Sequence, residues 1–184
     1  MHRNISLLIL ALSALLLQSG AQAQSTSAQS GIKARARGTK LILTSQGKRH
    51  TLDVSQSVDA ARLDDVSVLF ATRRPDSLYL LVAACGWSKL TSDDRQCGAG
   101  RECNLLWIKL NVTWKINDIK SVRYESCWAP ITSSDGYKIK GNTLQLEYSD
   151  LREDKEYKIT YDADRPEGGF RVEESAIKNE NPDD

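Results

Sequence analysis

The residues NLLWIKLNVTWKI, numbers 104–116, decide the class of fold. Every second position from Leu106 to Ile116 carries a large apolar side chain, and polar side chains and Trp107 fill the positions between them. This period of two is typical of a β-strand, because successive side chains of a strand point to opposite faces. A helix would scatter the same side chains around its axis. We therefore expect a strand over 104–116, with Trp114 facing a core and Trp107 facing outward.

The rest of the chain repeats this pattern in short segments separated by turn residues. Gly47, Pro75 and the pair Asn117-Asp118 mark the hairpin turns. The segment 78–85 is apolar on both faces, so we expect it at the centre of a sheet. Besides 104–116, strands are expected at 40–45, 49–54, 66–72, 78–85, 119–128, 143–148, 157–161 and 170–172. About nine short strands and no helical period predict an all-β fold, a single antiparallel β-sandwich, with a partly closed β-barrel as the alternative.

The start of the chain predicts export. An apolar run at 5–17 follows Arg3, and Ala21 and Ala23 are the small residues found before a signal-peptidase cleavage site. We expect a periplasmic or extracellular protein that is not inserted in a membrane after cleavage, since no second apolar run is long enough to span one. The predicted organisation is a signal peptide at 1–23, a disordered leader at 24–38, the β-sandwich domain at 39–174 and a flexible tail at 175–184.

The charges of the chain are balanced. Loss of Arg3 with the signal peptide leaves 24 basic and 24 acidic side chains out of 25 and 24. A neutral balance argues against a nucleic-acid partner, which is bound through a basic surface. The basic run KARAR at 33–37 is interpreted as part of the solvated leader.

Four cysteines in an exported chain predict two disulfides. We expect Cys97–Cys103, because Gly98 and Gly100 allow a tight turn, and Cys85–Cys127, joining the ends of two long strands. Closing the small ring would stabilise the fold by about 2.4 kcal/mol and closing the large one by about 4 kcal/mol. The cysteine spacing lacks the paired ligands of a zinc site and contains no C-x-x-C, so no metal, cofactor or redox pair is expected.

The sequence offers little for catalysis. His50 is the one histidine beyond the signal peptide, and it lies among basic residues on an expected strand, so we interpret it as an exposed strand residue. Asp162 and Asp164 fit a turn better than a calcium loop. The protein is therefore expected not to be an enzyme.

Two surfaces are candidates for binding. Arg101 and Glu102 would be held at the crown of the Cys97–Cys103 loop, where a fixed conformation lowers the cost of binding. Tyr79, Trp107 and Trp87 would form an aromatic patch on neighbouring strands, suited to a sugar ring or a protein partner.

These observations predict a non-enzymatic, exported, disulfide-stabilised binding domain whose partner is a protein or a glycan. One alternative is an inhibitor of an exported protease or lysozyme-type enzyme that acts through the 97–103 loop. A second alternative is a hydrolase that uses a pair of carboxylates, since glycoside hydrolysis requires two acids at a suitable separation.

Overall fold

The fold was analysed in a computed structural model that describes residues 31–89 and 100–177. Within these ranges the chain consists of strands and turns, with one 3-10 turn at Pro166–Gly168 and no α-helix. The predicted all-β class with antiparallel pairing is confirmed. The described residues accordingly contain no helix of the length and apolar character needed to cross a membrane. The expected signal peptide, 1–23, lies outside the described residues.

The strands form two antiparallel sheets. The small sheet consists of β1 (Lys33–Arg37), β2 (Lys40–Ser45) and β3 (Lys48–Asp53). The large sheet has the order β12 (Arg171–Ala176), β11 (Lys155–Asp162), β10 (Thr143–Asp150), β8 (Ile131–Thr132), β7 (Ile116–Ser126), β6 (Arg101–Asn111), β5 (Ser77–Ser88) and β4 (Ala60–Arg73), with β9 (Tyr137–Lys140) paired to β10. Its end strands β4 and β12 do not pair, so the sheet is not closed into a barrel.

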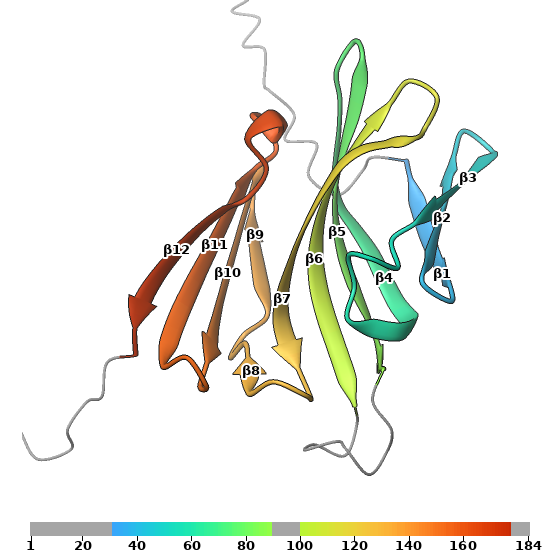
Figure 1. Cartoon of the computed structure of the whole chain (residues 1–184). Coiled ribbons are helices and arrows are strands. Elements are labelled where there is room, and N and C mark those ends of the chain that lie inside the picture. The colour runs from blue at the N-terminus through green and yellow to red at the C-terminus, as the bar shows by residue number, and fades with distance from the viewer. Residues whose placement is uncertain (1–30, 90–99, 178–184) are drawn as a thin grey trace, which may run out of the picture.

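The large sheet bends so that its two halves face each other. Figure 1 shows β10, β11 and β12 standing opposite β5 and β6, while the small sheet lies on the other side of β4 and β5. The strands β5 and β6 are therefore covered on both faces, which confirms the central position predicted for 78–85. The arrangement is sandwich-like but has three layers, whereas we expected a single two-sheet sandwich.

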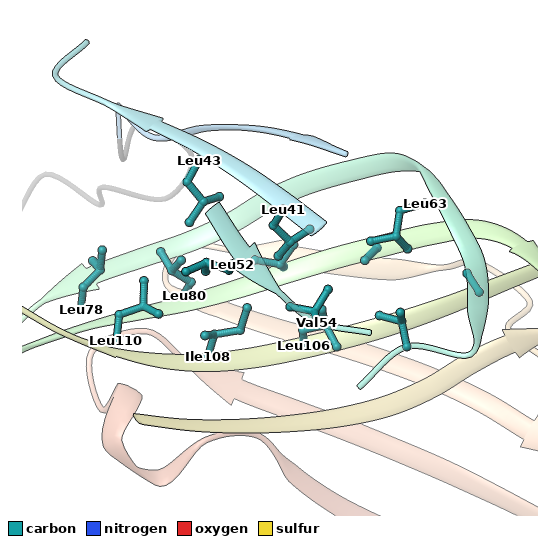
Figure 2. Packing of buried hydrophobic residues seen from close by; sticks show 14 residues of the cluster. Leu41, Leu43, Leu52, Val54, Leu63, Leu78, Leu80, Leu106, Ile108 and Leu110 are labelled. Carbon is teal, nitrogen blue, oxygen red and sulfur yellow. The ribbon is translucent and has the colours of Figure 1, made fainter. Parts of the chain in front are cut away.

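The first core fills the space between the small sheet and β4–β6. Leu41 and Leu43 of β2 point at Leu80 and Ile108, and all four side chains are fully buried (Figure 2). Each such leucine or isoleucine stabilises the fold by about 1.5–3 kcal/mol relative to an exposed one. This packing fixes the small sheet on the large one.

The second core fills the concave face of the large sheet. Leu81 and Leu105 of the central strands pack with Leu144, Leu146 and Ile159 of β10 and β11. At one end the turn after β11 closes this core, because the Trp107 indole Nε1 donates a hydrogen bond to the carbonyl of Pro166 at 2.8 Å. The concave face is thus filled by side chains rather than open to a ligand.

The strand that decided the fold class is shorter than predicted. It ends at Asn111 rather than 116, and the turn to β7 is made by residues 112–115, not by Asn117-Asp118. Trp114 lies in this turn with a φ of 63°, and it packs half-buried against the first core instead of belonging to the strand as we expected. The cause is local, since the Asn111 side chain binds the backbone ahead of it and diverts the chain.

The boundaries of the folded part also differ from the prediction. The expected leader 24–38 contains β1, because Ala34 and Ala36 alternate with cations and pack on the first core. At the other end β12 runs to Ala176, two residues into the expected tail. Short apolar side chains at alternate positions are enough for a strand when a neighbouring sheet covers them.

The predicted disulfides are wrong for the cysteines that can be compared. Cys85 bonds Cys103, with the two Cα atoms 4.1 Å apart, so neither Cys97–Cys103 nor Cys85–Cys127 forms. The reason is register: antiparallel pairing of β5 and β6 places the two residues directly opposite each other. Closing this ring, whose cysteines are 18 residues apart, stabilises the fold by about 3 kcal/mol. No described cysteine is free, and Cys97 lies outside the described residues.

Candidate functional site

The residues predicted to crown a binding loop belong instead to strand β6. Arg101 forms an ion pair with Asp64 at 3.2 Å, and its side chain is 37% exposed. Glu102 is 1% exposed, and neither of its carboxylate oxygens has a hydrogen-bond partner among the described residues. Both residues therefore lie in the wall of the fold rather than on a protruding loop. The preceding residues 90–99 are outside the described part of the chain.

The predicted aromatic patch is largely internal. Tyr79 is 4% exposed and Trp107 is 2% exposed, and their rings contact each other with centroids 5.8 Å apart. Trp87 alone of the three is exposed, at 40%. The expectation of an outward face fails because the bent half of the sheet covers this side of β5 and β6.

A general acid needs a raised pKa. Hydrogen bonds and nearby cations lower the pKa of four described carboxyls instead, and the main partner is Ser55 for Asp53, Lys138 for Asp135, Arg165 for Asp162 and Arg74 for Glu167. In the ranges 31–89 and 100–177, no three His, Cys, Asp or Glu side chains are grouped as metal ligands. Nothing described here favours the hydrolase.

A different site is built on the turn between β6 and β7. The Asn111 Oδ1 atom accepts hydrogen bonds from the Thr113 amide at 2.9 Å, the Thr113 hydroxyl at 2.8 Å and the Lys115 amide at 3.0 Å. The Trp114 amide also donates to the Asn111 carbonyl at 3.0 Å. These bonds hold Trp114 in the left-handed region, which is a rare conformation for a bulky residue.

Trp114 is held there against the small sheet. Its ring stacks on His50 of β3 with the centroids 3.9 Å apart and the planes 6° from parallel. Both rings are half-buried. The stack joins two sheets, so His50, which we expected to be an exposed strand residue, is half-buried and forms half of an aromatic platform.

The platform lines an open hollow of about 600 Å³ where three hairpin ends meet. The ends are the β2–β3 turn, the β6–β7 turn and the end of β4, which lie together at the top of Figure 1. The hollow is lined by Ser45, Gln46, Lys48, His50, Arg73, Val112, Thr113 and Trp114. Gln46 also has a positive φ of 49°, so two of these turns hold a non-glycine residue in the left-handed region.

The hollow is electropositive. No Asp or Glu lines it, and the exposed Lys48 and Arg73 have no ion-pair partner within the described chain. Ser45, Gln46 and Thr113 add hydrogen-bonding groups. The arrangement suits a ligand that is negatively charged, rich in hydrogen-bond acceptors and flat on one face.

Sequence reasoning missed this site because Trp114 continues an alternating pattern perfectly. Asn111 could have indicated the turn, because an asparagine side chain often accepts a hydrogen bond from the backbone amide two residues later and so starts a turn. The contact with His50 carries no sequence signal, because the two residues are 64 positions apart and meet only through the packing of two sheets.

Comparison with known proteins found no relative of this chain. No protein-family model matches this chain, and neither a curated protein nor a solved structure matches it.

Proposed function

We propose that this chain is an exported, non-enzymatic binding domain that holds an acidic saccharide in the hollow beside Trp114. The observation that carries the proposal is the aromatic platform of His50 and Trp114 next to Lys48 and Arg73, two cations with no ion-pair partner in the described part of the chain. Periplasmic or extracellular location is supported by the Cys85–Cys103 disulfide, since such bonds persist in oxidising compartments.

The chemistry of the hollow favours this ligand class. Sugar rings present flat C–H faces that pack on aromatic planes. A carboxylate, sulfate or phosphate on the sugar would pair with Lys48 and Arg73, and charge-assisted hydrogen bonds are stronger than neutral ones. Two turns fixed in uncommon backbone conformations keep the hollow preorganised, which lowers the entropy lost on binding.

The other hypotheses receive less support. An inhibitor acting through Arg101 and Glu102 requires an exposed loop, yet one residue is paired with Asp64 and the other is buried. A hydrolase requires an acid in the site, and the hollow has none. A binding role needs neither feature.

Calorimetric titration with trigalacturonate, followed in parallel by tryptophan fluorescence, tests the proposal. We expect binding by the oxidised chain from Gln24 onward, and at least tenfold weaker binding of the methyl-esterified trisaccharide, which keeps the rings and loses the charges. The double variant Lys48→Gln/Arg73→Gln should lose the preference for the acidic form. Trp114→Ala should weaken both forms.

The matched control is Lys138→Gln/Lys140→Gln, which makes the same change in net charge on β9, away from the hollow. It should bind as the unaltered protein does. Equal affinity for the acid and its ester, or equal affinity of the two double variants, would show that the hollow is not the site.

A further inference from the structure

The solvent-facing side of the small sheet is a regular array of cations. Cross-strand pairing sets Lys33 beside Thr44 and Arg49, Arg35 beside Ile42 and Thr51, and Arg37 beside Lys40 and Asp53. The cations at these positions are all exposed, and we call the set Lys33, Arg35, Arg37, Lys40 and Arg49 the basic face. Alternate residues on a strand are about 6.6 Å apart and neighbouring strands about 4.8 Å apart, so the five charges lie on one compact plane.

The charges of the basic face are not neutralised within the fold. Among residues 31–89 and 100–177, none of its five cations has an acidic partner within 4 Å, in contrast to the ion pairs found on β9, β10 and β11. Its single carboxylate, Asp53, accepts hydrogen bonds from the Ser55 side chain and amide, and these bonds and then Lys40 lower the pKa of Asp53. Five cations against one carboxylate leave the face with an excess of positive charge.

The opposite end of the molecule is acidic. Residues 33–53 contain six lysines and arginines and one aspartate, whereas residues 131–177 contain seven basic and eleven acidic side chains. Figure 1 shows these two segments at opposite sides of the fold. The neutral total thus conceals a strong charge separation, which would orient the molecule at a charged surface.

The basic face is suited to contact without insertion. The exposed large apolar side chains of the described chain are elsewhere, at Trp87, Val112, Trp128, Ile139, Leu151 and Val172. A membrane-inserting face would need such side chains. The other side of the small sheet is held by the first core, so the charges stand on a rigid support.

We propose that the basic face docks this domain on an anionic phospholipid membrane. A plane of negative headgroups can reach all five cations at once, whereas a linear polyanion would follow one row of them. The lack of an exposed aromatic on the face also disfavours single-stranded nucleic acid, which stacks its bases on such rings. The contact is electrostatic and reversible, with the acidic β10–β12 region pointing away from the membrane.

This docking is separate from the saccharide site, because the basic face lies on the outer side of the small sheet and includes no residue of the hollow. Each proposal can therefore fail alone, since the two tests use different probes and different variants.

Vesicle co-sedimentation tests the docking. The oxidised chain from Gln24 onward is mixed at low salt with vesicles of phosphatidylglycerol and phosphatidylcholine, or of phosphatidylcholine alone. We expect binding to the anionic vesicles only, and its loss as rising salt screens the charges. Removing three cations in Lys33→Gln/Arg35→Gln/Arg37→Gln should lower the partition coefficient about a hundredfold, since each cation contributes about fivefold.

The matched control is Lys138→Gln/Lys140→Gln/Lys158→Gln, which changes the net charge equally on the acidic side and should bind like the unaltered chain. If the β1 variant disturbs its strand, Lys40→Gln/Arg49→Gln removes charges from β2 and β3 and should weaken binding about twentyfold. Absence of binding to anionic vesicles at low salt overturns the proposal, as do equal losses in the two triple variants. Retention on heparin without vesicle binding also overturns it, in favour of a polymeric partner.

Discussion

At the scale of single residues, Glu102 is the side chain least explained by stability. Residue 102 pairs in the sheet with Gly86 and Ser126, and among the described residues neither oxygen of its buried carboxylate finds a donor. A buried polar group without a partner costs free energy, because it loses its hydrogen bonds to water and gains none in return. The fold thus keeps a carboxylate at a position where an apolar side chain would be more stable. Such unfavourable residues occur more often at functional sites than in ordinary cores.

Replacing Glu102 by an apolar side chain of similar length should therefore stabilise the protein. We expect Glu102→Met to raise the free energy of unfolding by about 1–3 kcal/mol in urea denaturation. Glu125→Met is the control, since that glutamate is exposed on β7 and its replacement should change stability by less than about 0.5 kcal/mol. A loss of stability in Glu102→Met would contradict the absence of partners for the carboxylate.

At the scale of elements, the close approach of β4 to β5 depends on Gly86. A Cβ atom on this residue would overlap the Arg62 carbonyl oxygen and lie 2.7 Å from the Leu63 Cα. The register between the two strands shifts at Leu63, where β4 crosses over the glycine. Gly86 directly follows Cys85, which pairs with Cys103 on the other side of β5.

Substituting Gly86 should disrupt the pairing of β4 with β5. We expect Gly86→Ala to lower the free energy of unfolding by about 3 kcal/mol or more, since both obstructing atoms belong to the backbone and cannot rotate away. Gly168→Ala is the matched control, because nothing lies within 4 Å of its Cβ position and its φ is not positive. Thermal and urea unfolding of both variants measure the difference, and similar stabilities would show that β4 can move away from β5.

At the scale of the whole molecule, the concave core gathers five of the chain's six tyrosines. Three are buried and two pack at its margin, and the sixth, Tyr157, stacks on Tyr148 with the ring centroids 4.9 Å apart. Burial raises the pKa of Tyr148 to about 12, and it also raises the pKa of Tyr124 and Tyr161. The folded state thus resists ionisation of these hydroxyls more strongly than the unfolded chain does.

This difference predicts the pH at which the fold weakens. Tyrosines of the unfolded chain ionise near pH 10, so the stability is fully present below about pH 10 and is lost as the pH rises from there to about 12. Urea denaturation at several pH values between 8 and 11 should show stability falling from about pH 10 upward. Tyr148→Phe should show a shallower fall. A flat profile in the unaltered chain would contradict the burial of these hydroxyls.

The local pattern of the sequence was sufficient for the class of fold and for several of its parts. Alternation in 104–111 predicts a strand because each side chain's face depends only on its own neighbours in the chain. The double-sided apolar character of 78–85 similarly predicts its central place. The β2–β3 turn at Gln46-Gly47 and the β4–β5 turn at Arg74–Asp76 also followed from residue preferences alone. Export stays a prediction from the first residues of the chain.

Only the tertiary structure decided which faces are covered, which cysteines meet and where the charges gather. The bent half of the large sheet buries Tyr79 and Trp107, strand register joins Cys85 to Cys103, and sheet packing brings His50 to Trp114. Each of these contacts links residues that are distant in the chain, so no local pattern specifies it. The same holds for charge, since a neutral total says nothing of where the lysines and arginines lie until β1, β2 and β3 align them on one face.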